Sequence, residues 1–380
     1  MNPHVLVIQQ DPTDDRFLND ATIKSCLSHS GCLSPTAVEN CAIERIQPDS
    51  FSTTYRSQFD LVILEYQQGG HSNDGSRLRQ LDMPVILLVE ERDRQLAEAF
   101  SQQPDFDVVV RASDLENRLS ECISRVTLRS SVERTNRELS RAETAQRAML
   151  LSAPPVIPGF DIGARIVPAR IVGGDFFDIT PTKDQNHCFV IGDVTGHGLN
   201  AAVRMAEAQA YFRAFLRCPG NESVEPASVL HRVNGLLTET CADMPLLATA
   251  MILSLSPESR SFVWSGAGHQ GYLLRKSGRI EPLHSTGPVL GCVEDTEYST
   301  IGPRDLETGD AILLATDGIA ETCSSRVNLF GRDRMLDCIR EHADKPASET
   351  LEHLFEQARL FRGASAQKDD MTAVLIRVVD

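Results

Sequence analysis

Residues 173–178 read GGDFFD and residues 191–198 read IGDVTGHG, and each segment places an aspartate beside glycine next to an apolar run. Residues 313–318, LLATDG, and residues 367–372, QKDDMT, place further aspartates after or before apolar runs. The carboxylates concerned are Asp175, Asp178, Asp193, Asp317, Asp369 and Asp370. A carboxylate at the end of a strand beside glycine lies on a rigid rim where backbone approaches a ligand closely.

We expect these carboxylates to meet in space. Four or more of them within a few ångströms repel one another, so divalent cations are needed to neutralise the cluster. Oxygen-only ligands favour Mn²⁺ or Mg²⁺ over Zn²⁺. Two such ions about 4 Å apart activate a water for attack on a phosphoryl group. For any single aspartate the alternative is a helix cap or a turn residue.

The order of six segments carries a family resemblance. GGDFFD, GDVTGHG, SGAGH, LETGDAILLATDGIAE, LFG and KDDMT follow one another as in the metal-dependent protein phosphatase family (PPM type), and they resemble its bacterial sigma-factor-regulating branch. The resemblance covers residues 160–380 and extends upstream to AETAQRAMLLS, which is similar to the AxxIQxxLLP lead-in of that branch. It implies an α+β phosphatase domain at 153–380, with two stacked antiparallel sheets flanked by helices.

The same resemblance implies a ligand set for two Mn²⁺ or Mg²⁺ ions. Asp193 would bridge the ions, and the carbonyl of Val194 would be an added ligand. Asp175, Asp317 and Asp369 would complete the shells directly or through water, with Asp370 exchangeable for Asp369. Asp175, Asp193, Asp317 and Asp369 are therefore the predicted catalytic residues.

Three further residues near these motifs are weighed separately. Arg170 stands five residues before Asp175, the offset at which some family members carry a phosphate-gripping arginine, and a guanidinium suits that role. His197 is displaced along its turn relative to the DGHGG pattern of eukaryotic-type members, so we predict a structural role for it. His269, in SGAGH, is predicted to be a scaffold residue outside the catalytic set.

Residues 1–112 show a different rhythm. HVLVIQ, FDLVILE, PVILLVE and FDVVVR are apolar runs separated by amphipathic stretches, which predicts an α/β domain with a parallel five-stranded sheet and helices on both faces. The runs resemble the strands of response-regulator receiver domains of two-component signalling. The residues at the expected magnesium and phosphotransfer positions are Gln9, Gln10, Glu65, Val89 and Arg111.

These five residues do not suit receiver chemistry. Neutral amides add no charge for magnesium, valine has no hydroxyl, and glutamate projects one methylene too far for in-line transfer. We therefore predict a pseudo-receiver that senses through protein contacts. An ion pair between Arg111 and Glu65 is an alternative that would imitate a switched site.

Residues 113–152 form the predicted linker. Up to Leu151 they contain neither glycine nor proline, and apolar residues recur at spacings of three and four from Leu115 to Val126 and again from Val132. This predicts one long helix, with a stuttered coiled coil and a homodimer as its consequence. The helix ends before the prolines of SAPPVIPG.

Composition restricts the partners. A net charge of -16 without a dense Lys/Arg run argues against nucleic acid and anionic membranes as partners. The N-terminus lacks a signal-peptide pattern and no run is long enough to span a membrane, so we expect a cytoplasmic protein. Ten scattered cysteines indicate neither a zinc site nor a disulfide framework.

The resulting hypothesis is a phosphatase that acts on phosphoserine or phosphothreonine of a regulatory protein, for which the resemblance implies an anti-anti-sigma type. The first rival is a non-catalytic signalling adaptor that binds a regulatory partner. The second is a phosphodiesterase or nucleotide hydrolase. The sequence argues against it, because it has neither a GxxxxGK[ST] loop nor an HD-type histidine cluster.

Overall fold

The computed structural model describes two compact units, residues 1–138 and 139–380. Within them it describes residues 4–8, 20–29, 41–46, 61–65, 85–90, 106–111, 115–151, 153–196, 198–217, 224–240, 247–325 and 328–380. Gln9, Gln10 and His197 lie outside the described residues.

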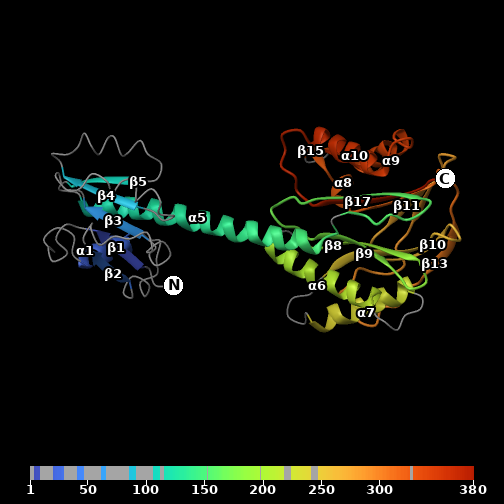
Figure 1. Cartoon of the computed structure of the whole chain (residues 1–380), viewed down its shortest axis with the longest axis horizontal. Coiled ribbons are helices and arrows are strands. Elements are labelled where there is room, and N and C mark those ends of the chain that lie inside the picture. Colours follow the sequence, from blue (N-terminus) through green and yellow to red (C-terminus); the bar gives the residue numbers. More distant parts are fainter. Residues whose placement is uncertain are drawn as a thin grey trace. The chain divides into compact units, whose positions relative to one another are not determined.

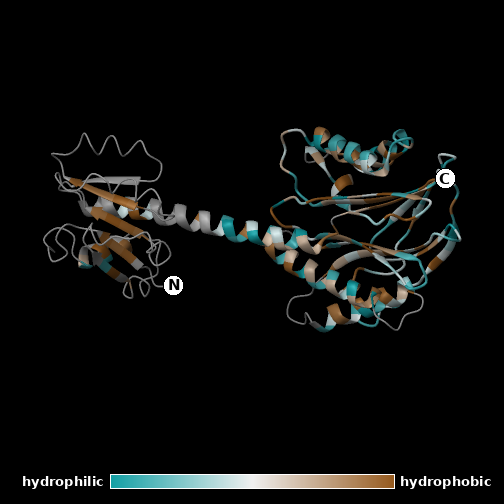
Figure 2. Cartoon of the chain, in the orientation of Figure 1, coloured by the Kyte–Doolittle hydropathy of each residue, from teal (hydrophilic) through white to brown (hydrophobic). Residues whose placement is uncertain are grey.

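The first unit contains a five-stranded parallel sheet with the strand order β2-β1-β3-β4-β5. Its elements are β1 (His4–Ile8), α1 (Asp20–His29), β2 (Ala42–Ile46), β3 (Leu61–Glu65), β4 (Val85–Glu90) and β5 (Phe106–Arg111). Figure 2 shows β3 and β4 coloured hydrophobic. Continuous apolar runs of this kind form strands that are buried on both faces, and Ile63 and Ile86 are fully buried.

One helix, α5 (Leu115–Met149), contributes to both units. Near its start, Ile123 belongs to the core of the first unit. At its other end, Gln146 is buried in the second unit and Leu150 packs against a core there. Between them the helix is largely polar, and Val132 is 52% exposed.

The second unit is built on two five-stranded antiparallel sheets (Figure 1). One sheet has the order β13-β10-β9-β8-β7, and the other has the order β12-β11-β14-β17-β6. The strands are β6 (Phe160–Val167), β7 (Asp175–Pro181), β8 (His187–Val194), β9 (Ala248–Ser256), β10 (Ser261–Ala267), β11 (Gly271–Leu274), β12 (Ile280–Leu283), β13 (Ile301–Asp305), β14 (Ala311–Ala315) and β17 (Met371–Val378). A small pair, β15 (Cys323–Ser325) and β16 (Asn328–Leu329), stands apart.

Helices cover the outer faces of the two sheets. They are α6 (Leu199–Leu216), α7 (Pro226–Thr240), α8 (Asp317–Ala320), α9 (Gly331–Glu341) and α10 (Ala347–Arg362). One apolar cluster packs α6 and α7 on the first sheet, a second lies between the sheets, and a third packs α9 and α10 on the second sheet. The prediction of two stacked antiparallel sheets flanked by helices is confirmed.

Sandwiching explains the burial of the central strands. All eight residues of β17, MTAVLIRV, are buried, because one face meets the partner sheet and the other meets α10. A strand covered on both sides is mostly apolar, and its two polar residues, Thr372 and Arg377, are buried with hydrogen-bond partners. Several aspartates of this domain, by contrast, lie at or next to strand ends, among them Asp175, Asp193, Asp310 and Asp370.

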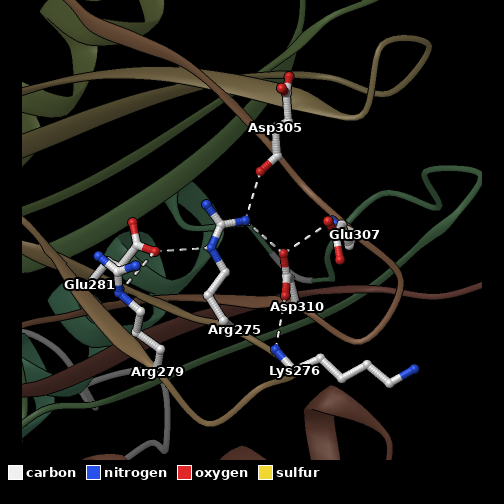
Figure 3. A network of polar contacts seen from close by, with 7 residues as sticks. All are labelled: Arg275, Lys276, Arg279, Glu281, Asp305, Glu307 and Asp310. Carbon is white, nitrogen blue, oxygen red and sulfur yellow. Dashed lines mark hydrogen bonds and ion pairs between the residues drawn. The ribbon is translucent and has the colours of Figure 1, made fainter.

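One acidic group at a strand end is neutralised within the protein (Figure 3). The buried carboxylate of Asp310 accepts a hydrogen bond from Arg275 Nη1 at 2.9 Å and from the backbone N–H groups of Lys276 and Glu307 at 2.9 and 3.0 Å. Arg275 also pairs with Glu281 at 3.2 Å. Such a satisfied network fixes the turn between β13 and β14.

No helix among the described residues is both long enough and apolar enough to cross a membrane.

Candidate metal centre

The hairpin of β7 and β8 brings the first two predicted aspartates together. Asp175, the first residue of β7, lies directly opposite Asp193, near the end of β8. The backbone N–H of Val194 donates to the carbonyl of Gly174 at 3.2 Å, and a Cβ on Gly174 would lie 2.6 Å from the Val194 carbonyl oxygen. Glycine is therefore required for this close approach at the strand end.

Two threonines from the other sheet hold the Asp175 side chain. The hydroxyls of Thr316 and Thr372 donate to Asp175 Oδ2 at 2.8 and 2.7 Å. Thr316 precedes Asp317, and Thr372 follows the Asp369–Asp370 pair, so these bonds tie three predicted segments to one carboxylate. Asp175 is almost completely buried.

Asp370 has a different role from its neighbour Asp369. Its Oδ1 accepts a hydrogen bond from the backbone N–H of Ala169 at 2.7 Å, and its Oδ2 accepts one from Gly174 at 2.6 Å. A Cβ on Gly318 would lie 1.9 Å from the Asp370 carbonyl oxygen. Asp370 is thus a buried clamp between loops, whereas Asp369 is half-buried.

Carboxylates dominate the electrostatics of Asp193. Burial and the nearby Asp317 and Asp369 carboxylates raise the pKa of Asp193 to about 7, while a hydrogen bond from Asp175 opposes the rise. Burial and the Asp193 charge likewise raise the pKa of Asp175 well above its ordinary value, despite the hydrogen bonds from the two threonines. Among the described residues, every charged group that shifts the pKa of Asp193 is another carboxyl group.

Glu321 joins this cluster, although the sequence analysis did not select it. Burial and the charges of Asp317 and Asp369 raise its pKa. Its signal in the sequence was a spacing of four residues from Asp317 within TDGIAE, which places both side chains on one side of a helical turn.

The cluster offers the oxygen donors of a hard-cation site, but its side chains are not yet spaced as they would be around an ion. Within the described ranges, no three His, Cys, Asp or Glu side chains are arranged closely enough to hold an ion. The charges of Asp317 and Asp369 nevertheless act on two other carboxyl groups, since they raise the pKa of both Asp193 and Glu321. All donors are oxygens, which fits Mn²⁺ or Mg²⁺, and a bound cation would remove the repulsion that raises these pKa values.

The end of α5 contacts the same loop. Gln146 Nε2 donates to the carbonyl of Gly173 at 2.8 Å, and the backbone N–H of Gly173 donates to Gln146 Oε1 at 3.1 Å. The side chain is 8% exposed. One amide therefore satisfies both backbone groups of the residue two positions before Asp175.

Three further residues of the sequence motifs are described by the structure. Arg170 is exposed on the loop that precedes Gly173. His269 is buried, its Nδ1 lies 3.1 Å from the Thr249 hydroxyl, and burial lowers its pKa to about 4. Asp178 is buried and pairs with Arg213 of α6, so it anchors a helix.

Among the five predicted receiver positions, the structure describes the side chain of Val89. Val89 is fully buried in β4. Glu65 and Arg111 are the last residues of β3 and β5, but their side chains lie outside the described part.

A cavity of about 1040 Å³ opens beside Asp317. Its walls come from the β10–β11 turn, from β11, from α8 and from the first turn of α9. Its lining includes His269, Gln270, Tyr272, Asp317, Arg332 and Arg334.

Comparison with known proteins is consistent with this geometry. The family profile described as Stage II sporulation protein E (SpoIIE) matches residues 183–379, which is more than half of the chain. Phosphoserine phosphatase RsbU of Bacillus subtilis (strain 168) is 27% identical over 253 residues, covering 66% of this chain and 73% of RsbU. Phosphoserine phosphatase RsbP of the same organism is 24% identical, covering 64% of this chain and 58% of RsbP.

A solved structure supports the fold. The SiaA-PP2C domain of Pseudomonas aeruginosa has a TM-score of 0.57 and 24% sequence identity, and the match covers 66% of this chain and 99% of that domain. At this identity the likeness concerns architecture alone, and it shows a PP2C-like fold.

Proposed function

This chain belongs to the SpoIIE family, and from that premise we propose that it is a metal-dependent protein serine/threonine phosphatase. The observation that carries the proposal is the position of Asp193. It lies opposite Asp175 and within the electrostatic reach of Asp317 and Asp369, which come from distant segments. Carboxylates grouped in this way repel one another, and a bound cation removes that repulsion. The grouping is therefore expected of a cation site.

The ions would be held by Asp193, Asp175, Asp317 and Asp369, with the Val194 carbonyl as a further donor. Bound Mn²⁺ or Mg²⁺ supplies Lewis-acid activation of water and neutralises charge on a phosphoryl group. Thr316 and Thr372 orient the Asp175 carboxylate, and Asp370 fixes the loop that carries it. We assign Asp370 to this positioning role and Asp369 to the ions.

Two residues near the cluster are given subsidiary roles. Arg170 is exposed on the loop that the Asp370 clamp fixes through Ala169, so it is the candidate to bind the phosphoryl group. His269 is buried and neutral, which supports the scaffold role expected from its sequence.

The substrate is proposed to be a phosphoserine or phosphothreonine protein. Two relatives carry the name phosphoserine phosphatase, and their alignments cover 66% and 64% of this chain. We propose a regulatory phosphoprotein of the anti-anti-sigma type, acted on in the cytoplasm. The acidic net charge is consistent with a protein partner in place of nucleic acid or membrane.

Regulation is proposed to pass through α5. The parallel sheet order β2-β1-β3-β4-β5 is that of flavodoxin-like and receiver folds, which supports a pseudo-receiver at 1–112 followed by a helical linker at 113–152. We propose that two copies of α5 pair, and the exposed apolar side chain of Val132 on this helix supports such pairing. Gln146 then connects the helix to the loop before Asp175.

A substitution tests that connection. We expect Gln146→Leu to lower turnover several-fold, because the Gly173 backbone groups lose their partner. Arg147→Ala is the matched control, since Arg147 lies one residue further along α5 with its side chain 77% exposed. Equal turnover in the two variants would remove Gln146 from the regulatory path.

The function itself is tested by hydrolysis of p-nitrophenyl phosphate and of a phosphoserine protein with added Mn²⁺. We expect the native chain to hydrolyse both, and Asp193→Asn to hydrolyse neither. Equal rates in the two proteins would reject the catalytic role. Binding of a phosphoprotein without hydrolysis would favour the adaptor hypothesis instead.

A further inference from the structure

The cavity beside Asp317 has the size of a ligand site. Its volume of about 1040 Å³ lies at the upper end of the range for ligand pockets. Asp317 contributes to this cavity and also to the charges around Asp193. A chain that places its phosphorylated residue at the acidic cluster therefore has this cavity directly beside it.

Two arginines of the cavity wall differ in how their charge is used. Arg334 Nη1 donates to the carbonyls of Leu329 and Phe330 at 2.9 Å each, and its guanidinium stacks 4.9 Å from the centre of the Phe361 ring. Arg332 has a weaker partner, since its Nε lies 3.7 Å from Asp333 and the two side chains are 61% and 91% exposed. Exposed pairs of this kind contribute little, so the Arg332 guanidinium is available to an incoming carboxylate.

Arg332 lies near a hydrogen-bonded pair of the cavity wall. The hydroxyl of the buried Tyr272 accepts a hydrogen bond from Gln270 Nε2 at 3.0 Å, and the Arg332 charge opposes the rise that burial causes in the pKa of Tyr272. Gln270 and Tyr272 come from the sheet, whereas Arg332 comes from α9. Arg332 is thus an exposed cation on the α9 side of the cavity, and its planar fork suits bidentate binding of a carboxylate.

Two further features of the wall are suited to polar ligand atoms. The first turn of α9 lines the cavity, and Phe330 at its N-cap position provides no side-chain cap. Free backbone N–H groups at a helix start attract negative charge. His269, whose Nδ1 lies 3.1 Å from the Thr249 hydroxyl, also lines the cavity.

Building on the proposed phosphatase function, we propose that this cavity receives the substrate segment beside the phosphorylated residue, and that Arg332 binds an acidic side chain of that segment. The enzyme would then prefer phosphoproteins with Asp or Glu next to the phosphorylated site. The preference would come from Arg332 itself, since an exposed guanidinium attracts carboxylates and repels lysine side chains.

The test compares two phosphoserine peptides that differ only in the residues flanking phosphoserine, glutamates in one and lysines in the other. With Mn²⁺, we expect the native chain to show a kcat/KM about fivefold higher for the glutamate peptide. Arg332→Gln is expected to bring the ratio close to one, and Arg332→Glu to invert it. Arg304→Glu, an exposed reversal on β13 outside this cavity, is expected to keep the native ratio.

The outcomes separate this inference from the function on which it rests. A ratio that is unchanged in Arg332→Glu, in a protein that still hydrolyses both peptides, overturns the role of Arg332. A native chain that hydrolyses neither peptide nor p-nitrophenyl phosphate with Mn²⁺ overturns the phosphatase function. Thermal melting of each variant shows whether a changed ratio comes from a folded protein.

Discussion

The second unit contains two sets of acidic side chains at strand ends, and they differ in their neighbours. Asp310 is buried against Arg275 and two backbone N–H groups (Figure 3). Asp193 is half-buried, and the charged groups found to act on it are carboxyl groups. The first set is complete within the protein. The second set needs a cation from outside, because like charges at close range cannot all ionise without one.

Two aspartates in similar sequence contexts can have different surroundings in the fold. LETGD and ATDG belong to one continuous segment, and both aspartates follow or precede the apolar strand β14. Only the three-dimensional partners distinguish the structural Asp310 from the proposed ligand Asp317.

The largest expected effect breaks the proposed cation site. Asp369→Asn should lower Mn²⁺-dependent hydrolysis of p-nitrophenyl phosphate about 1,000-fold, because a neutral amide is a poor ligand and the compensation of charge is lost. Asp310→Asn is the matched control, and its turnover per folded molecule should stay within about twofold of native. Similar losses in both variants would show that stability, and not the cluster, governs activity.

A second prediction compares stability. Asp310→Asn should lower the free energy of unfolding by about 3 kcal/mol, because the amide faces three donors and leaves Arg275 without its buried counterion. Asp193→Asn should instead raise the stability of the metal-free protein, since it removes one of several repelling charges. Urea titration in EDTA measures both, and destabilisation by Asp193→Asn would contradict the comparison.

Bound Mn²⁺ should stabilise the protein through the acidic set around Asp193 and not through the set around Asp310. At 100 times its Kd, Mn²⁺ should stabilise the native chain by about 2.7 kcal/mol. Asp310→Asn should keep that increment, although it starts from a lower stability. In Asp193→Asn the increment should largely vanish. A melting-temperature titration provides the measurement.

The pH dependence should show the smallest effect. The pKa of Asp193 is about 7 in the folded protein and near the ordinary carboxyl value when unfolded. The folded state therefore binds more protons between these values, so the stability of the metal-free protein should fall as pH rises from about 4 to 7. Asp193→Asn should reduce this slope, and saturating Mn²⁺ should reverse it. Parallel curves for native and Asp193→Asn would exclude the shift.

The sandwich and the meeting of the acidic segments were predictable from the sequence. The order of the motifs predicted that Asp175, Asp193, Asp317 and Asp369 converge. In the structure Asp175 lies opposite Asp193, and the charges of Asp317 and Asp369 raise the pKa of Asp193. Their detailed coordination stays a prediction. Arg170 as a phosphate ligand also stays a prediction.

The supporting contacts were not predictable, because they join residues far apart in the chain. Asp175 is held by Thr316 and Thr372, which lie 141 and 197 residues away. Asp369 and Asp370 looked interchangeable, and only the backbone donors of Ala169 and Gly174 separate their roles. No periodicity or motif spacing encodes a hydrogen bond from a side chain to a distant backbone group.

The bonds between Gln146 and Gly173 have a mechanical consequence. Successive residues of an α-helix are offset by about 100° around its axis, so a one-residue turn of α5 relative to the loop would swing this amide away altogether. Because a single side chain makes both bonds, they break or form together. A rotation of α5 of that size would therefore remove both hydrogen bonds to the loop before Asp175 at once.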